Sequence, residues 1–335
     1  MSANTLSVSF PLLLQEFFGQ RLTSQRNASP RTVESYRDAF MLLLKFAKEQ
    51  LKKQPTDLCM SDLDGPFVLN FLNYLEQERH VTVRTRNNRL AAIRSFMRYA
   101  STRDLPSLPQ IQSVLTVPMK RFDRPAIEFL SREEMQAILD APDASTWSGH
   151  RDQVLFALLY NTGARVSEIT GLNADQLTLG QTPSVLLHGK GRKQRTMPLW
   201  KSTARKIEAW FDRTKPDSNS PVFPNRFGGH ISRSGVEHRL RMLLQKACET
   251  CPSLQNRRIS PHTIRHTTAM HLLQSGVDIT VMALWLGHES IETTHLYVEA
   301  DLAMKEKTLG KLQPPTVSRT RYRPTDNLLA FLEAL

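Results

Sequence analysis

The sequence predicts a mainly α-helical protein of two domains, with a small antiparallel β-sheet in the second domain. Its 335 residues suffice for two buried cores, and 40% hydrophobic with 23% charged residues is ordinary for a folded chain. Hydrophobic residues recur with a helical period of 3.6 over most of the chain, whereas residues 177–199 change to short strand-like runs. Residues 106–125, between the two expected domains, carry four prolines.

The first domain, residues 1–105, is expected to be a bundle of four helices. The first helix covers residues 10–22. The second begins after an N-cap at Ser29, with a proline in its first turn. The third begins near Asp62, and the fourth extends from Val83 to Ser101. Short connections between such helices favour a compact bundle.

The second domain is expected over residues 126–310, after a proline-rich linker at residues 106–125. A capping box at Ser131 opens it, and strand-like runs on both sides of Gly189-Lys190-Gly191 predict an antiparallel hairpin. The tail, residues 311–335, is expected to be an extended basic spacer followed by a short amphipathic helix. Helices of the second domain are expected over residues 151–161, 202–211, 233–248, 261–274, 279–286 and 291–307.

The chain is strongly basic, with 44 Lys and Arg residues against 32 Asp and Glu and a formal net charge of +12. A folded chain of this charge usually binds a polyanion, most often nucleic acid. Residues 79–103 hold seven arginines and no acidic residue. The candidate DNA contacts in this segment are Arg84, Arg86, Arg89 and Arg94. The alternative is a solvated basic face without a partner.

The cysteines and the hydropathy pattern favour a cytoplasmic location. Three cysteines cannot form a disulfide framework. Cys248 and Cys251 form one CxxC without a second pair at zinc-ribbon spacing, and we expect them at the end of a helix. No apolar run approaches the roughly 18 residues of a membrane span, and the N-terminal sequence lacks the basic region of a signal peptide.

Four short sequence islands in the second domain carry the candidate chemistry. They are TGARVSEI at 162–169, HGKGRK at 188–193, HTIRH at 262–266 and LGH at 286–288, with Tyr297 nine residues later. In order and spacing this set resembles the tyrosine recombinase (phage integrase) family, especially the bacterial Xer-type and transposon-borne integrases. The resemblance is strong from about residue 131 to residue 310. It is weaker in the first domain, which corresponds to the family's core-binding domain.

The resemblance implies a site-specific recombinase that cleaves and rejoins DNA through a 3′-phosphotyrosyl intermediate. Strand exchange would pass through a Holliday junction, in the integration, excision or transposition of a mobile element. The implied substrate is double-stranded DNA with paired inverted half-sites. The implied assembly is a homotetramer, or a complex with sister recombinases. No cofactor, metal ion or membrane is expected.

The chemistry of a phosphodiester explains the residue types that the resemblance assigns. Arg165 and Arg265 would hold the non-bridging oxygens bidentately and stay charged at any working pH. Tyr297 would be the nucleophile, and its phenol, with an ordinary pKa near 10, needs help to lose its proton. Lys190 would be the general acid for the departing 5′ oxygen, with Lys193 as the rival on the same hairpin.

Other residues of the islands have expected supporting roles. His262 and His288 would donate hydrogen bonds to the phosphate or move the tyrosine proton, and the division of these roles stays open. Glu168 is expected to support the site, and the alternative for Arg165 is a surface ion pair with Glu168 and no catalytic role. Arg192 and Lys193 are expected to contact DNA phosphates.

Three other functions are compatible with parts of this pattern. His262 and His266 have the i,i+4 spacing of zinc ligands, but the segment lacks the glutamate of HExxH and holds a cationic arginine. A type IB topoisomerase-like nicking and closing activity would use the same pocket without strand exchange. A DNA-binding accessory protein that has lost catalysis would lack some of the six chemical positions, and none is missing.

Overall fold

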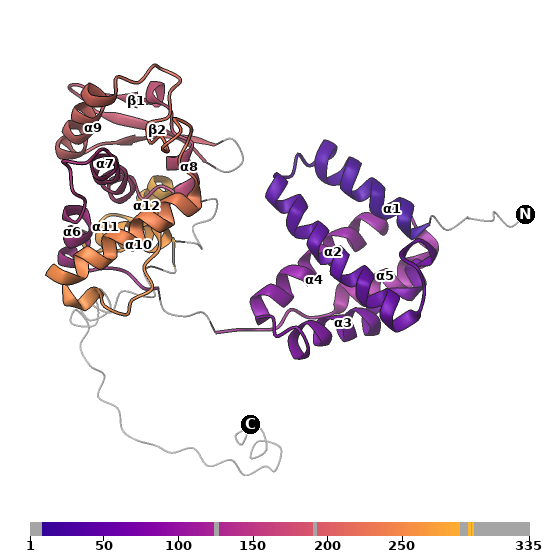
Figure 1. Ribbon diagram of the computed structural model, residues 1–335. Helices are drawn as coiled ribbons and strands as arrows, with labels where there is room; N and C mark the ends of the chain where they lie inside the picture. Colours follow the sequence, from indigo (N-terminus) through magenta and orange to yellow (C-terminus); the bar gives the residue numbers. More distant parts are fainter. Residues whose placement is uncertain (1–8, 124–126, 190–192, 289–293, 296, 298–335) are drawn as a thin grey trace, which may run out of the picture. The chain divides into compact units, whose positions relative to one another are not determined.

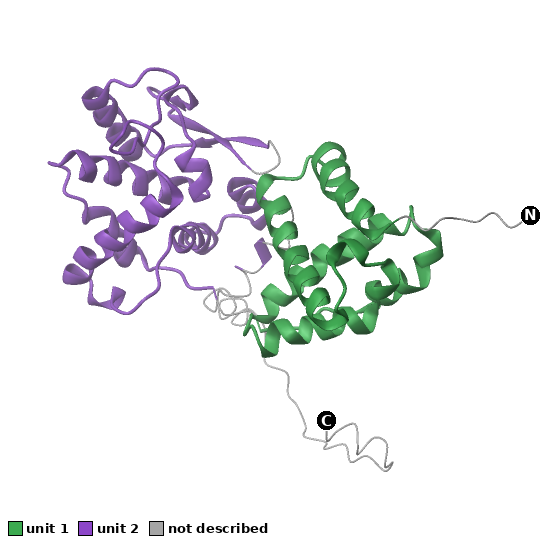
Figure 2. Ribbon diagram, turned by 45° about the vertical axis from the view of Figure 1, so that its right-hand side comes forward, with its two compact units in different colours: residues 1–124 green, residues 125–335 purple. Residues whose placement is uncertain are grey.

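The computed structural model describes residues 9–123, 127–189, 193–288, 294–295 and 297, and it divides into two compact units. Unit 1 comprises residues 1–124 and unit 2 residues 125–335, green and purple in Figure 2. Each unit has its own buried hydrophobic core. Helices dominate both units, and the described strands lie in unit 2 (Figure 1).

Unit 1 is built from helices α1 to α5, which short turns connect. Between α1 and α2 the chain continues with a π-helical pitch, so that the N–H of Arg26 donates to the carbonyl of Arg21, five residues back, at 3.0 Å. The helices are α1 Phe10–Glu16, α2 Pro30–Leu51, α3 Gly65–Gln77, α4 Val83–Ala100 and α5 Leu108–Thr116. The π-helical segment is Phe17–Gln25, and 3₁₀ turns lie at Pro55–Asp57, Met60–Asp62 and Leu105–Ser107.

Capping residues determine where three of these helices begin. The side chains of Ser29, Asp64 and Thr82 accept hydrogen bonds from backbone N–H groups three residues later, at 3.2, 2.8 and 3.3 Å. Prolines in the first turns of α2 and α3 remove no helical hydrogen bond, because N–H groups there have no partner within the helix. The predicted starts of the second and fourth helices are confirmed, whereas the third begins at Gly65 rather than near Asp62.

Aromatic rings form the centre of unit 1. Phe96 on α4 packs edge to face against Phe10, Phe17 and Phe40, with ring centroids 5.7, 5.5 and 5.3 Å away. The inner face of α4 also buries the four residues that the helical period predicts, namely Leu90, Ile93, Met97 and Ala100.

The segment expected to be a linker is partly helical, so that expectation is wrong for residues 108–116. Pro109 lies in the first turn of α5, where a proline is tolerated. Ile111 and Val114 are fully buried, and α5 packs against α3 and α4. With only two buried apolar residues, three positions apart, the segment has too weak a helical period to predict a helix against its prolines. Because this helix packs against α3 and α4, it belongs to unit 1.

Unit 2 combines helices with one small sheet. The helices are α6 Arg132–Asp140, α7 Trp147–Thr162, α8 Val166–Thr170, α9 Lys201–Thr214, α10 Arg233–Thr250, α11 Pro261–Gln274 and α12 Ile279–Leu286. The strands β1 Leu177–Thr178, β2 Ser184–His188 and β3 Gln194–Pro198 pair antiparallel in that order. Short 3₁₀ turns lie at Ala174–Gln176 and Pro252–Leu254. This architecture confirms the predicted fold class, mainly α with a small antiparallel sheet.

α7 lies in the middle of unit 2, where it packs against α9 and α11 (Figure 1). The helix begins at Trp147, four residues before its predicted start. Thr146 accounts for the difference, because its hydroxyl accepts a hydrogen bond from the N–H of Gly149 at 3.0 Å and so caps the helix. The predicted bounds of α11 and α12 are confirmed to the residue.

Two predicted segments fall beyond what the structure describes. These are most of the helix expected over residues 291–307 and the whole tail, residues 311–335.

Cys248 and Cys251 lie at the end of α10, as expected. Among the described residues there is no group of three or more candidate metal ligands, and no helix has the length and apolar character that a membrane crossing requires.

Candidate active site

Two helix ends meet at the centre of the candidate active site. α7 ends at Gly163 and α12 at Gly287, with positive φ angles of 60° and 64°. A side chain at either position would be strained by the positive φ angle and would displace a neighbouring side chain. A Cβ atom at Gly163 would lie 2.8 Å from Cδ2 of Leu286, and one at Gly287 would lie 2.9 Å from Nη1 of Arg195. The two turns therefore pack closely and present unpaired helix-end carbonyl groups as acceptors.

Arg265 on α11 is held by these two helix ends. It is only 2% exposed, and its Nη1 and Nη2 donate to the carbonyls of Gly163 and Leu286, both at 2.6 Å. Carbonyls at a helix C-terminus carry partial negative charge, which stabilises the buried cation. Burial, followed by the nearby Arg165, lowers the pKa of Arg265 to about 10, so the side chain remains charged at neutral pH.

Arg165 and Arg195 share the carboxylate of Glu168. Arg165, the N-cap of α8, donates its backbone N–H to Oε2 at 2.8 Å and its Nη1 to Oε1 at 3.1 Å. Its Nη2 donates to the carbonyl of Gly287 at 3.2 Å. Arg195 on β3 binds both oxygens of Glu168, at 3.0 and 2.7 Å, and its Nε donates to the carbonyl of Trp285. The Arg165–Glu168 ion pair of the alternative interpretation is present, but Arg165 also contacts the helix end at Gly287.

This arginine cluster, formed by Arg165, Arg195 and Arg265, keeps a surplus of positive charge. In the described part of the chain it holds three guanidinium groups and one carboxylate, that of Glu168, which leaves two positive charges. Burial raises the pKa of Glu168, but its bonds to Arg195 and Arg165 outweigh burial and lower that pKa below its usual value. The ionised carboxylate orients the arginines without neutralising them, and an anion would complete the site.

Tyr297 is buried beside this cluster, with 3% of its surface exposed. Its hydroxyl oxygen lies 2.9 Å from Nδ1 of His266. Its ring is parallel to that of His288 within 6°, with the centroids 6.3 Å apart. Burial raises the pKa of Tyr297, while Arg265 and Arg165 lower it. The same two cations would therefore stabilise a phenolate at this position.

The two buried histidines beside the phenol, His266 and His288, are neutral at physiological pH. Burial, together with His262 and Arg265, lowers the pKa of His266 to about 4. Burial and the nearby arginines have the same effect on His288, whose pKa is also about 4. Nδ1 of His288 lies 2.8 Å from the hydroxyl of Thr294. His262 is exposed, and its ring centroid lies 4.3 Å from that of His266.

The hairpin that carries the predicted general acid reaches the arginine cluster. Lys190 itself, with Arg192, lies outside the described residues. The N–H of Gly189 donates to the carbonyl of Lys193 at 2.7 Å, and the Lys193 side chain is exposed. A Cβ atom at Gly189 would lie 3.3 Å from Oε1 of Glu168, so this end of β2 is adjacent to the cluster. Five of the six predicted chemical positions are described, namely Arg165, His262, Arg265, His288 and Tyr297.

Two residues of the site were not predicted as parts of a phosphate site. The position of Arg195 could have been predicted from the alternation of inward-facing and outward-facing residues along β3. Because Met197 on β3 is buried, residue 195 points to the same inner face. His266 entered the sequence analysis only as a possible metal ligand. Its i+4 spacing from His262 already placed both imidazoles on one face of α11.

The arginines of α4 that the sequence predicts as DNA contacts differ in how far protein groups enclose them. Arg86 is 1% exposed, and both Arg86 and Arg94 donate to backbone carbonyls of residues 115–118. The segment after α5 packs on α4, and its carbonyl groups need donors, which accounts for these contacts. Arg84 is exposed, and Arg89 is half-buried and donates to the carbonyl of Ser35 at 3.0 Å. DNA contact by this helix stays a prediction.

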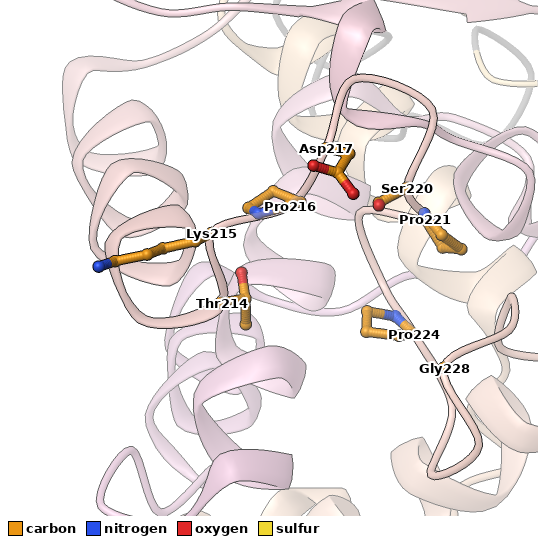
Figure 3. A pocket seen from close by; sticks show the side chains of 8 residues that line it. All are labelled: Thr214, Lys215, Pro216, Asp217, Ser220, Pro221, Pro224 and Gly228. Atoms are coloured by element: carbon orange, nitrogen blue, oxygen red, sulfur yellow. The ribbon is translucent and has the colours of Figure 1, made fainter.

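A pocket of about 320 Å³ lies in the loop that follows α9 (Figure 3). In the figure, the side chain of Asp217 lies near that of Ser220, whereas Lys215 extends away. The pocket is lined by Thr214, Lys215, Pro216, Asp217, Ser220, Pro221, Pro224 and Gly228. No member of the arginine cluster is among them, so this pocket is separate from the site around Tyr297.

Comparison with known proteins matches most of this chain to one family. The model of the phage integrase family matches residues 128–304, and the model of the phage integrase N-terminal SAM-like domain matches residues 14–104. The putative integrase/recombinase y4rC of Sinorhizobium fredii (strain NGR234) is 47% identical over 99% of this chain and 100% of its own length. Tyrosine recombinase XerC of Chlamydia muridarum is 30% identical over 88% of this chain and 95% of its own length.

Solved structures share the fold. The XerH site-specific recombinase bound to a palindromic difH substrate in a post-cleavage complex has a TM-score of 0.67 and 20% identity, over 85% of this chain and 81% of that chain. The Tn1549 transposon integrase in complex with transposon right-end DNA has a TM-score of 0.67 and 15% identity, over 89% and 98%. The present chain therefore belongs to the phage integrase family and is a tyrosine-type site-specific recombinase, an enzyme that breaks and rejoins DNA strands.

Proposed function

We propose that this chain cleaves double-stranded DNA through attack of Tyr297 on a phosphodiester and rejoins it after strand exchange. The phenolic oxygen bonds to phosphorus, and a 3′-phosphotyrosyl link replaces the bond to the 5′ oxygen. The freed 5′-hydroxyl of a partner strand then reverses the reaction, and exchange passes through a Holliday junction. Because each phosphoester bond is replaced by another, no ATP is consumed. The biological outcome is integration, excision or transposition of a mobile element.

One observation carries this proposal, namely the burial of Tyr297 beside Arg165 and Arg265 in a cluster with surplus positive charge. A phosphodiester carries one negative charge, and attack at phosphorus concentrates more charge on its non-bridging oxygens. Guanidinium groups fixed by helix ends can stabilise that added charge without reorganising. Each arginine would lower the barrier by about 3–4 kcal/mol, by analogy with single oxyanion-hole donors.

The leaving 5′ oxygen needs a proton, and Lys190 is the proposed donor. The nearness of Gly189 to Glu168 supports this role, because it brings the hairpin to the arginine cluster. Lys193 is the alternative donor on the same hairpin. His262 and His288 would donate hydrogen bonds to the phosphate, which the neutral imidazole of His288 can do without adding charge.

The proposed substrate is DNA with paired inverted half-sites, bound by a homotetramer or by a complex with sister recombinases. The DNA in the XerH and Tn1549 complexes supports a nucleic-acid substrate. Proposed phosphate contacts are Arg84 and Arg89 on α4 and Arg192 and Lys193 on the hairpin. DNA as substrate also fits the cytoplasmic location that we propose.

The test of this function uses a half-site whose nick lets the cleaved end escape, so that cleavage cannot be reversed. The chain should form an adduct with this DNA that survives denaturation, and Tyr297→Phe should bind the DNA without forming it. On intact paired sites, recombinant product indicates strand exchange, whereas relaxation of supercoils alone indicates nicking and closing. An adduct formed by Tyr297→Phe at the rate of the unaltered chain would refute the assignment.

The proton donor has its own test. Lys190→Ala should slow cleavage of ordinary DNA about 100-fold or more, in the range of general acid catalysis. It should matter little when sulfur replaces the 5′ bridging oxygen, because sulfur departs without a proton. Rescue by sulfur of Lys193→Ala but not of Lys190→Ala would identify Lys193 as the donor instead.

A further inference from the structure

The hydroxyl group of Tyr297 contacts a histidine that lies outside the six positions assigned by family resemblance. Nδ1 of His266 is 2.9 Å from Oη of Tyr297, and the two ring centroids are 5.6 Å apart. His266 follows Arg265 directly on α11, so a single helix turn positions both a guanidinium and an imidazole beside the phenol. The contact joins the reacting oxygen to a group that can accept its proton.

The surroundings of His266 keep its imidazole neutral. The titratable groups that face it in the described part of the chain are His262 and Arg265 on its own helix, His288 after α12, and Tyr297 itself. None of these is a carboxylate that would favour a protonated ring. A neutral imidazole that carries its hydrogen on Nε2 has its lone pair on Nδ1, where the hydroxyl of Tyr297 donates.

His288 is placed less well for the same task. Its ring is parallel to that of Tyr297, so its face rather than a ring nitrogen is turned toward the phenol. Its Nδ1 lies 2.8 Å from the hydroxyl of Thr294. The geometry therefore separates the two buried histidines, one aimed at the phenolic oxygen and one stacked on the ring.

We propose that His266 is the general base that removes the proton of Tyr297, an inference that rests on the proposed function, in which Tyr297 is the nucleophile. As Oη bonds to phosphorus, its proton moves to Nδ1 of His266. The bond from phosphorus to the 5′ oxygen breaks, and that oxygen takes a proton from the general acid. In rejoining, the 5′-hydroxyl gives its proton back to the general acid as it attacks phosphorus. Oη leaves, and His266 returns the proton to it, so the protons balance over the cycle.

Binding of DNA makes this transfer favourable at a histidine that is neutral in the free protein. A phosphate diester next to the ring is an anion, and an anion raises the proton affinity of imidazole. The phenol also becomes more acidic as its oxygen bonds to phosphorus, while Arg165 and Arg265 stabilise the charge that develops. The base is therefore needed during attack rather than before it.

The test measures single-turnover adduct formation on half-site DNA with a 5′ bridging sulfur, so that protonation of the leaving group does not limit the rate. His266→Asn keeps a polar atom near the position of Nδ1 but cannot take up a proton at neutral pH. We expect cleavage about 100-fold to 10,000-fold slower, the range of general acid–base catalysis, with DNA affinity unchanged. His271→Gln, which replaces another buried histidine of α11, is the matched control and should stay within about threefold of the unaltered chain.

A second measurement distinguishes a base from a residue that only orients the tyrosine. Fluorinated tyrosine at position 297 has a more acidic phenol and depends less on a base. It should restore cleavage to His266→Asn at least tenfold, and the restored rate should rise with pH, whereas it should change the rate of the unaltered chain little. His266→Gln repeats the experiment if the asparagine variant folds poorly.

Three outcomes would overturn the proposal while leaving the proposed function intact. These are an unaltered rate in His266→Asn, a slow rate that fluorotyrosine does not restore, or equal gains from fluorotyrosine with and without His266. Tyr297→Phe, assayed beside them, reports on the proposed function separately. An adduct formed by that variant would contradict the nucleophile itself, not the base.

Discussion

Buried arginines occur in both units, and comparing them shows what distinguishes a reactive site. In unit 1, Arg86 is 1% exposed and donates to the carbonyl of Pro118 at 3.2 Å and to Oδ1 of Asn87 at 3.1 Å. In unit 2, Arg265 is 2% exposed and donates to two helix-end carbonyls. Burial and backbone acceptors are therefore shared by a structural arginine and a candidate catalytic one.

The two arginines differ in the group on which their charge acts. Arg86 lies 3.7 Å from the carboxylate of Glu76, which also binds Lys120 at 2.7 Å. Arg265 acts on Tyr297, where it opposes the rise in pKa that burial causes. Buried arginines thus indicate a reactive site only where their charges act on a nucleophilic side chain such as Tyr297.

Arg265→Lys should produce the largest effect that follows from this comparison. Lysine keeps the charge but loses the planar fork that donates to two carbonyls and, in the proposed function, to the phosphate. We expect single-turnover adduct formation to fall about 100-fold or more, roughly 3 kcal/mol in activation free energy, while DNA binding is retained. Arg86→Lys is the matched control and should stay within about threefold per bound protein. Equal losses in the two variants would erase the distinction between the units.

Arg86→Met should instead destabilise unit 1. The substitution leaves the carbonyl of Pro118 without its arginine donor and removes one of the two cations beside Glu76, at a cost of about 2–3 kcal/mol in the free energy of unfolding. The tryptophans at positions 147, 200, 210 and 285 all lie in unit 2. Far-UV circular dichroism should therefore show an earlier transition while tryptophan fluorescence keeps its midpoint. A shifted fluorescence midpoint would mean that Arg86 stabilises more than its own unit.

Most of the fold could be predicted because helix ends are local features. Pro261 and Gly287 mark boundaries of α11 and α12 in the sequence itself, and both helices end where predicted. α5 was missed because its helical character rests on burial of Ile111 and Val114 against other helices, which a short proline-rich segment does not reveal.

The candidate site was less predictable, because the partners of its charged groups are distant in sequence. The order and spacing of the sequence islands identified Arg165, Arg265 and Tyr297 as candidate site residues, through resemblance to the family. No local rule indicates that Glu168 is bound by Arg195, 27 residues later. For the same reason the sequence does not predict that arginines of α4 donate hydrogen bonds to backbone carbonyls of residues 115–118.

Acid should weaken unit 2 more than unit 1. Burial lowers the pKa of His150, His266, His271 and His288, whereas unit 1 has one histidine, His80. In the folded state His266 and His288 stay neutral to about pH 5, and His150 and His271 take up protons less readily than in the unfolded chain, where histidines titrate near pH 6.5. The unfolded state then binds more protons, so the free energy of unfolding decreases as the pH falls from 7 toward 4.

This decrease should be about 2 kcal/mol between pH 7 and 5, after allowing for the solvent that reaches part of each ring. Urea titrations followed by tryptophan fluorescence report on unit 2 and would measure it. The double variant His266→Asn/His288→Asn should have a flatter pH profile, because two of the four groups no longer titrate. An unchanged profile would place the acid sensitivity in other residues.

The smallest expected effect concerns the arginines of α4 that remain accessible to DNA. Arg84 is exposed and Arg89 half-buried, whereas Arg86 is enclosed by protein groups. If the first two contact phosphates, Arg84→Ala and Arg89→Ala should each reduce the slope of log affinity against log salt concentration by about 0.9, the contribution of one phosphate contact. Arg86→Met should leave the slope unchanged, because its guanidinium does not reach solvent. Anisotropy titrations of a labelled half-site between about 50 and 200 mM salt measure these slopes. A slope that falls as far for Arg86→Met as for Arg84→Ala would mean that DNA draws Arg86 out of its carbonyl contacts, and the contrast between the two units would then hold only for the free protein.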